Sequence, residues 1–520
     1  MESRGGLAPV LDERDPLERK GSRVAAWLLM VAALGALLVL YVRVSSWTSC
    51  WRWSIAEGRE SPCVYALWRL LHGHDLYEWP TRPPYSISFY NFGFYQAYVS
   101  VLRVFGVDGE RLLFVPRFLT LFGAAVGALA FVRVGAGLAP PRDRTGWLTL
   151  GALGFVVWCG TQFASWWVLS VRPDVWAVVF ALGGLGLALR REGRGLGTLA
   201  AASLLFFLAW SFKQSCILTF VGLMLGLAVG RRFRDAFVLG APFAILVATA
   251  LVIGGDVYRF NVVTAPAASR FKLTLLLGVL ERTLPQNLWI LGFFPLAFWF
   301  TGEGPRLARF RSLSLANRQV IGAALVAIAF GIVAFGREGS NKNQLFEGYV
   351  LAALASWSAW ARSRESMSPR ISLLGAALAL PLAVFPLLQL AGVRGSGRLV
   401  FCADSDAREL ERMAAAVAAL PKPLFSDEEV WALPWNSSDS RYPAMVIDST
   451  WYGVAEREHL VPPGFVANLL ASGRFKSALL PVLHPVLGVL RAQGVPCAEL
   501  GPKPFGLRFV GCVLPQRSGR

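Results

Sequence analysis

The side chains best suited to chemistry in this sequence are carboxylates, arginines and a lysine that stand where apolar stretches begin or end. Glu57 and Glu60 follow the first apolar run, and two short polar elements stand beside later runs: Val171-Arg172-Pro173-Asp174 and Phe212-Lys213-Gln214. A carboxylate can take a proton from an attacking hydroxyl group, and guanidinium and ammonium groups stabilise anionic oxygens. Ionisable groups within a bilayer are costly and usually functional. The pattern predicts a polar site at a membrane surface.

The amino-acid composition indicates that these residues belong to a membrane protein. The chain has 520 residues, of which 55% are hydrophobic and 16% are charged, whereas soluble proteins average about 25% charged residues. Apolar stretches of about 20 residues, long enough to cross a bilayer, recur along most of the chain. A soluble core could not bury so much apolar surface. We therefore expect an α-helical polytopic membrane protein with about 11 to 13 transmembrane helices.

The basic residues predict an orientation rather than a nucleic-acid site. The formal charge is +18, but the arginines gather in short clusters between apolar runs, as the positive-inside rule describes for cytoplasmic loops. Two predicted spans separate each cluster from the next, so all five are expected on the cytoplasmic side. They are Arg133/Arg142/Arg144, Arg190/Arg191/Arg194, Arg231/Arg232/Arg234, Arg306/Arg309/Arg311/Arg318 and Arg362/Arg364/Arg370.

Changes in composition divide the chain into three parts. Residues 1–23 are polar and basic, and are expected to be cytoplasmic. Residues 24–394 form the transmembrane part, with a first external loop over 45–86 that carries interfacial helices. Charges return over 395–520, which is predicted to be a small extracytoplasmic α/β domain with strands ending near 427 and 448 and another over 475–483. The candidate spans are 24–42, 87–105, 113–132, 147–170, 175–189, 197–212, 216–230, 236–254, 286–302, 319–336, 348–361 and 371–392.

One span conflicts with this orientation. If the N-terminus is cytoplasmic, a full crossing at 87–105 breaks the alternation that the arginine clusters require. Either that segment does not cross the bilayer, or one boundary is misplaced.

Acidic residues stand at span ends rather than within spans. From the second half of the 147–170 run onward, no Asp or Glu occupies the middle of an apolar run. A proton-coupled transporter would need carboxylates near the bilayer midplane. A site at the outer surface fits better, because the acidic residues fall at the external ends: Asp174, Asp256, Glu281, Glu338 and Glu347.

Several short motifs in order resemble those of the GT-C membrane glycosyltransferases, in the branch with protein O-mannosyltransferases and the lipid A aminoarabinose transferase. The likeness opens with a carboxylate beyond the first span and a helix ending in Gly73-His74-Asp75-Leu76-Tyr77. It then follows Phe89-Tyr90-Asn91, Arg117 after a proline, Val171-Arg172-Pro173-Asp174, Phe212-Lys213-Gln214-Ser215 and the segment 339–347 with Asn343. Each motif is degenerate alone, but the collinear set covers nearly the whole chain.

The resemblance implies a GT-C fold and an inverting transfer of a sugar from a polyprenyl-phosphate donor. The acceptor would be an envelope glycan, lipid or protein at the outer face of a bacterial cytoplasmic membrane, and the acceptor hydroxyl needs a carboxylate base. Glu60 aligns best with the catalytic carboxylate by its spacing to the later motif, whereas Glu57, which precedes a glycine, matches locally but lies three residues early. Ser61 replaces the usual glycine, and Asn91 stands where many members have proline.

The remaining roles also follow from the resemblance. Asp174 would orient donor or acceptor, and the carrier phosphate would be held by Arg117, Arg172 and Lys213, with Tyr90, Gln214 and Asn343 as further substrate-binding residues. No metal-site spacing occurs, since the sequence has no CxxC element or nearby histidine pair. Some family members use a divalent cation, which Glu60 and Asp174 could share.

Ordinary structural roles are the alternatives for these residues. Glu57 and Glu60 could be solvated charges that pair with Arg52 or Arg59. Asp174 could cap a helix after Pro173. The basic residues could extend to lipid headgroups; these are Arg117, Arg172 and Lys213.

Two other classes of membrane protein compete with the transferase. A transporter or lipid-carrier flippase would need polar groups along a central path and, often, related halves. An O-antigen polymerase or ligase would carry its arginine-rich site on large external loops late in the chain. Here the first loop holds the residues suited to chemistry.

The seven cysteines allow disulfides outside the membrane. Cys50 with Cys63, and Cys497 with Cys512, fall in segments predicted to be external, where oxidation is favoured. Cys159 and Cys216 belong to apolar runs and are expected to be packing residues.

Overall fold

The computed structural model describes most of the helical part and most of the C-terminal part. The described residues are 16–52, 60–160, 167–190, 195–283, 313–338, 342–363, 369–392, 402, 404–427, 433, 445–446, 449–501 and 508–515. Glu57 and the predicted span 286–302 lie outside them, so the number of spans stays a prediction.

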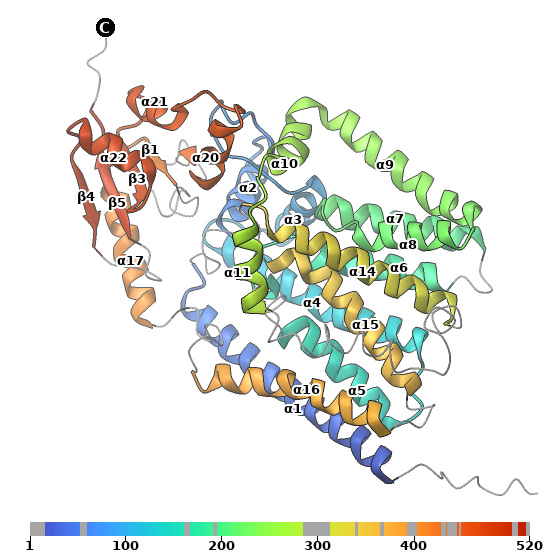
Figure 1. Ribbon diagram of the computed structural model, residues 1–520. Coiled ribbons are helices and arrows are strands. Elements are labelled where there is room, and N and C mark those ends of the chain that lie inside the picture. The colour runs from blue at the N-terminus through green and yellow to red at the C-terminus, as the bar shows by residue number, and fades with distance from the viewer. Residues whose placement is uncertain are drawn as a thin grey trace, which may run out of the picture.

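Helices dominate the described chain (Figure 1). Four are long and apolar enough to cross a membrane: Arg23–Thr48, Arg111–Leu138, Phe233–Ala267 and Leu315–Phe335. The helices up to residue 392 are α1 (Pro16–Ser49), α2 (Ser61–Leu71), α3 (Phe92–Val104), α4 (Arg111–Leu138), α5 (Arg144–Phe155), α6 (Asp174–Leu189), α7 (Leu196–Phe212), α8 (Leu218–Val229), α9 (Phe233–Arg259), α10 (Ala265–Ala267), α11 (Leu273–Thr283), α14 (Leu315–Phe335), α15 (Phe346–Ser363) and α16 (Pro369–Leu390).

The segment 87–105, whose crossing conflicts with the predicted orientation, contains the short helix α3. It has 13 residues, which at 1.5 Å per residue span about 20 Å, less than the bilayer core of about 30 Å. Helix α8, in the predicted span 216–230, is equally short with 12 residues, so the crossing of 87–105 stays a prediction. Gly93 lets α3 lie against α7, because a Cβ atom there would stand 2.7 Å from the carbonyl oxygen of Ser211.

The described arginines that follow α4, α6 and α8 share one end of the helical bundle. These helices begin near Arg117, Asp174 and Thr219, and their other ends lie at or before Arg142, Arg190 and Arg231. In Figure 1 the C-terminal ends of these helices lie on the side of the bundle away from the C-terminal sheet. The shared end agrees with the sequence pattern, while its assignment to the cytoplasm stays a prediction.

The C-terminal part is a small mixed sheet with helices. Its strands are β1 (Leu424–Ser426), β2 (Met445–Val446), β3 (Ser477–Pro481), β4 (Cys497–Leu500) and β5 (Phe509–Val513), in the order β2-β1-β3-β5-β4. Strand β1 is parallel to β2 and β3, whereas β5 is antiparallel to β3 and β4. The three predicted strands are confirmed as β1, β2 and β3. Its helices are α17 (Asp404–Ala419), α20 (Ser449–Arg457), α21 (Phe465–Ala471) and α22 (Pro485–Ala492).

Helix α20 joins this sheet domain to the first external loop. The hydroxyl of Tyr452 lies 2.7 Å from the carbonyl oxygen of Pro80 and 3.0 Å from that of Tyr85. Tyr85 has a left-handed backbone with φ of 62°, and its own hydroxyl accepts a hydrogen bond from Arg474 at 2.6 Å. A non-glycine residue in this conformation costs about 1–3 kcal/mol unless its surroundings hold it. The sheet domain supplies those contacts.

Charged side chains form a second contact between the two parts. Glu338, after α14, pairs with Lys272 and Arg457, and Glu458 pairs with Arg270 and Arg457. The hydrogen bonds from Lys272 and Arg457 lower the pKa of Glu338, and those from Arg270 and Arg457 lower the pKa of Glu458.

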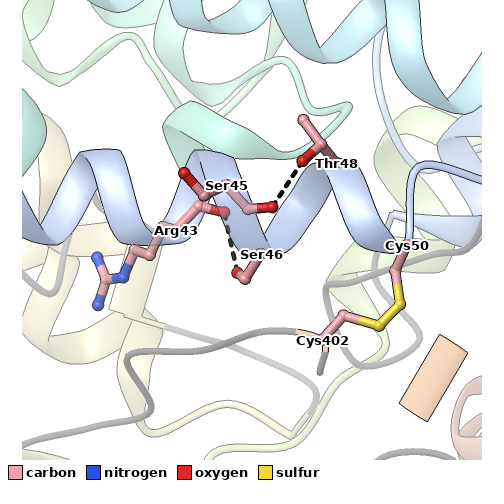
Figure 2. The surroundings of a disulfide bond; sticks show 6 residues. All are labelled: Arg43, Ser45, Ser46, Thr48, Cys50 and Cys402. Carbon is pink, nitrogen blue, oxygen red and sulfur yellow. Dashed lines mark hydrogen bonds between the residues drawn. A yellow bond between two sulfur atoms is a disulfide. The ribbon is translucent and has the colours of Figure 1, made fainter. Parts of the chain in front are cut away.

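The disulfides correct one predicted pairing and confirm the other. Cys50, after the end of α1, bonds to Cys402 across 352 residues of sequence, and Figure 2 shows the bond beside the last turns of α1. The Cys50–Cys63 pairing was wrong, because Cys63 is buried within α2 and forms no disulfide. The predicted Cys497–Cys512 disulfide is present and links facing residues of β4 and β5.

The pairing predicts the thiol content. Denatured, unreduced protein should expose three free thiols, those of Cys63, Cys159 and Cys216, and seven after reduction. Peptide mapping should recover a cross-link between Cys50 and Cys402, and Cys63→Ser should leave that cross-link intact. A cross-link lost in Cys63→Ser would contradict the pairing.

The charged contact predicts a dependence on pH. Because the pKa values of Glu338 and Glu458 are lowered, their ion pairs stabilise the docked arrangement fully at pH values above about 4.3, the usual pKa of a glutamate in an unfolded chain. This stabilisation is lost as the pH falls through the lowered pKa values. We expect hydrogen exchange in α20 to increase below about pH 4. Glu338→Gln should raise the exchange at neutral pH and flatten its response to acid. An unchanged profile in the variant would contradict this assignment.

Candidate active site

Glu60 and Arg117 form a buried ion pair between the first loop and α4. Glu60 directly precedes α2, and Arg117 follows Pro116 within α4. Arg117 donates from Nε to Oε1 at 2.8 Å and from Nη2 to Oε2 at 2.7 Å. Oε1 also accepts a hydrogen bond from the backbone N–H of Val171 at 2.9 Å. Both side chains have no exposed surface.

These contacts decide between the interpretations of Glu60 and Arg117. Arg52 pairs with Glu110 at 3.0 Å, so a solvated Glu60 paired with Arg52 is wrong. A fully buried Arg117 likewise does not extend to lipid headgroups. A buried charge is tolerated only with a partner, and each of these two side chains supplies one for the other.

Asp174 lies at the centre of a second buried group. Its Oδ1 accepts hydrogen bonds from Nζ of Lys213 and from Nδ2 of Asn343, the latter at 2.7 Å. Its Oδ2 accepts from Nε of Arg172 at 3.1 Å. Asp174 is the first residue of α6, Lys213 follows the end of α7, and Asn343 lies in a 3₁₀ turn (Lys342–Leu345) before α15. Three distant segments therefore meet on one carboxylate.

Arg172 connects Asp174 to aromatic side chains. Its Nη2 donates a hydrogen bond to the hydroxyl of Tyr90, and its guanidinium carbon lies 4.4 Å from the ring centre of Trp167. A cation over an aromatic face is stabilised by the ring quadrupole. Both Arg172 and Lys213 are buried, at 5% and 3% exposure, so neither extends to headgroups.

The two groups share one stretch of backbone. Val171 donates its N–H to Glu60, and the next residue, Arg172, contacts Asp174. Glu60 and Asp174 thus hold the same short segment from its two sides. The structure brings the predicted residues together, apart from Glu57, which lies outside the described residues.

Gln214 and Asn91 hold the backbone beside Tyr90. Gln214 donates from Nε2 to the carbonyl oxygens of Phe89 at 2.6 Å and Val262 at 3.2 Å. Asn91 is buried and accepts a hydrogen bond from the Tyr258 hydroxyl at 2.7 Å. Gln214 therefore acts on the loop that carries Tyr90.

The carboxylates of the site meet cationic partners. Among the described residues, no group of three or more His, Cys, Asp or Glu side chains is arranged to hold a metal ion. Glu60 contacts Arg117, and Asp174 contacts Arg172 and Lys213. A cation shared by Glu60 and Asp174 thus stays a prediction from the resemblance, and no step is derived through it.

Two residues at the site were not predicted. Trp167 lies in a short 3₁₀ turn and contacts Arg172. Glu347 is the second residue of α15, four residues after Asn343, and is 4% exposed. Its position at the end of the predicted span 348–361, beside the segment with Asn343, was the signal that could have identified it.

The arrangement of the helices matches known membrane glycosyltransferases. No protein-family model matches the chain, and no curated protein matches it by sequence. The structure of ArnT from Cupriavidus metallidurans in the apo state superposes with a TM-score of 0.58 at 14% identity, covering 94% of this chain and 98% of ArnT. The chain has a GT-C-like fold.

Two further structures give the same result. ArnT from C. metallidurans bound to undecaprenyl phosphate matches with a TM-score of 0.53 at 14% identity, over 94% of this chain and 98% of that one. The apo oligosaccharyltransferase of Archaeoglobus fulgidus matches with a TM-score of 0.53 at 13% identity, over 88% of this chain and 69% of that one. The chain is a multi-pass membrane protein with a small C-terminal mixed sheet.

The buried pair predicts a loss of stability when one partner is removed. Arg117→Met removes the cationic partner of Glu60, and breaking a buried pair from one side costs about 3–5 kcal/mol. We expect a lower unfolding temperature in detergent, and partial recovery in the double variant with Glu60→Gln. Arg103→Met, at an exposed position, is the matched control. Equal stability of Arg117→Met and this control would refute the pairing.

Proposed function

We propose that the chain transfers a sugar from a polyprenyl-phosphate donor to an acceptor on the outer face of a cell membrane. The observation that carries this proposal is the convergence of Arg172, Lys213 and Asn343 on Asp174 in a GT-C-like fold. The relatives of that fold include a structure of ArnT bound to undecaprenyl phosphate. The acceptor is proposed at the level of an envelope glycan, lipid or protein.

The cations of the site would bind the carrier phosphate. When a lipid phosphate leaves the sugar, its developing charge is stabilised by preorganised donors in a water-poor site. Arg172 and Lys213 are held in place by Asp174 before any substrate arrives. Arg117, whose guanidinium makes two hydrogen bonds to Glu60, is better placed to fix the first loop than to meet a phosphate.

Glu60 is best explained here as a positioning residue. A general base needs a lone pair aimed at the proton that it takes, and both oxygens of Glu60 accept hydrogen bonds from Arg117. By also binding the Val171 N–H, Glu60 fixes the backbone that leads into Arg172 and Asp174. A base role for Glu60 or Glu57 stays a prediction, which the pH dependence of Glu60→Gln would test.

The position of the arginines supports a site on the outer face of the membrane. Asp174 begins α6 and Lys213 follows the end of α7, so the site lies at the opposite end of α6 from Arg190, and cytoplasmic loops collect lysine and arginine. The sheet domain docks on the same end, through Tyr452 and the loop at Pro80–Tyr85. Disulfides in that domain agree with an oxidising compartment.

The decisive experiment follows sugar transfer by purified full-length protein. Lys213→Met should lower kcat for a polyprenyl-phosphate sugar by about 100-fold, in the range for loss of one transition-state donor. Arg172 and Asn343 still hold Asp174 in this variant, so its thermal unfolding should change little. Lys476→Met, at an exposed site, is the matched control. Wild-type turnover by Lys213→Met would refute the proposed role of this cluster.

A further inference from the structure

Glu347 is a buried carboxylate beside the proposed site that none of the roles above uses. It is the second residue of α15 and is 4% exposed. A buried carboxylate is costly unless its oxygens find donors. Its contacts therefore indicate what it does.

The two oxygens of Glu347 differ in their hydrogen bonds. Oε1 accepts hydrogen bonds from the backbone N–H of Thr219 at 2.7 Å and from the Thr219 hydroxyl at 2.5 Å. The backbone N–H of Leu218 also interacts with the carboxylate, and both residues lie in the first turn of α8, where free N–H groups favour an anion. Oε2 is buried and makes no hydrogen bond of regular geometry within the described part of the chain.

The carboxylate of Glu347 lies within electrostatic reach of the site. Asn343, one turn before Glu347, donates to Asp174, and the carboxylate of Glu347 interacts electrostatically with Lys213. Gln214, next to Lys213, likewise has a buried carbonyl oxygen, Oε1, without a donor among the described residues. Two buried acceptors near Lys213 thus make no hydrogen bond of regular geometry among the described residues.

Capping of α8 accounts for only one of the two oxygens of Glu347, Oε1. A neutral amide oxygen at the position of Oε1 could also accept the hydrogen bonds from Thr219, and an amide side chain would avoid a second buried anionic oxygen. An unsatisfied buried polar group costs about 1–3 kcal/mol, and more if it is charged. Such a group in a native structure calls for an explanation such as a ligand.

We propose that Oε2 of Glu347 accepts a hydrogen bond from a hydroxyl group of the transferred sugar. The inference rests on the proposed glycosyl transfer and adds the class of sugar. A second carboxylate near Lys213 favours a neutral, hydroxyl-bearing sugar and repels a sugar that itself carries a carboxylate. Because Oε2 is buried in this structure, binding requires the side chains that cover it to move.

The test compares Glu347→Gln with wild type on three probes. These are undecaprenyl phosphate without sugar, its neutral hexosyl derivatives and the matching hexuronosyl derivatives. The glutamine can keep its carbonyl oxygen on Thr219, but it places an N–H₂ donor where Oε2 stood. We expect the KM for neutral sugars to rise about tenfold, the discrimination against uronic sugars to shrink, and the affinity for the bare carrier to stay within about twofold.

Two controls separate this role from a purely structural one. Thr219→Val removes a donor to Oε1 and leaves Oε2 in place, so it should lower the unfolding temperature without changing the preference between sugars. Asp256→Asn makes the same carboxylate-to-amide change at a 79% exposed side chain and should behave as wild type. Equal loss of bare-carrier and sugar-linked binding in Glu347→Gln, or an unchanged preference, overturns the inference. Wild type that consumes none of the sugar donors overturns the proposed function itself.

Discussion

The structure depends on the mutual neutralisation of charges buried at one end of the helical bundle. Two carboxylates and three cations are almost fully covered there, and none would be tolerated alone in a low-dielectric interior. Glu60 faces Arg117, while Asp174 faces Arg172 and Lys213. Because Val171 and Arg172 are consecutive, the two groups cannot move apart independently. This requirement fixes the positions of α4, α6 and α7 relative to one another. The hydrogen bond from Asn343 to Asp174 fixes the beginning of α15 in the same way.

The sheet domain extends this constraint beyond the bundle. Tyr452 contacts two carbonyl groups of the first loop, and Arg474 holds the hydroxyl of Tyr85. The same loop continues to Phe89, whose carbonyl accepts from Gln214, and to Tyr90, which accepts from Arg172. The loop is thus held at one end by the sheet domain and at the other by the ionic cluster. A displacement of the sheet domain would therefore shift the polar site, because only the few backbone residues between Tyr85 and Tyr90 connect the two contacts.

The sequence predicted the site better than the connections around it. Asp174 and Lys213 could be grouped because each is a polar residue at the end of an apolar run, and run ends on one side of a bundle meet, whereas Asn343 was assigned through the resemblance. Cys402 could not be assigned to Cys50, because 352 residues of sequence separate them and only the folded chain brings them together. Strands β4 and β5 were missed, because β4 is mostly exposed and β5 carries a glycine that weakens its strand pattern. Glu347 also stands at the end of an apolar run, so the run-end pattern would have found it.

The saturation of Glu60 separates two kinds of carboxylate at the site. Glu60 and Asp174 are surrounded by donors, and in such surroundings a carboxylate holds neighbours in place instead of accepting new hydrogen bonds. Glu347 keeps one oxygen for a cap, and its other oxygen makes no hydrogen bond of regular geometry among the described residues. Under the proposed function, a site that releases its sugar needs interactions of the second kind, because a group fully used by the protein contributes equally with and without substrate. The fixed ion pairs would then set the geometry, and acceptors such as Oε2 of Glu347 are where we propose that a sugar is distinguished.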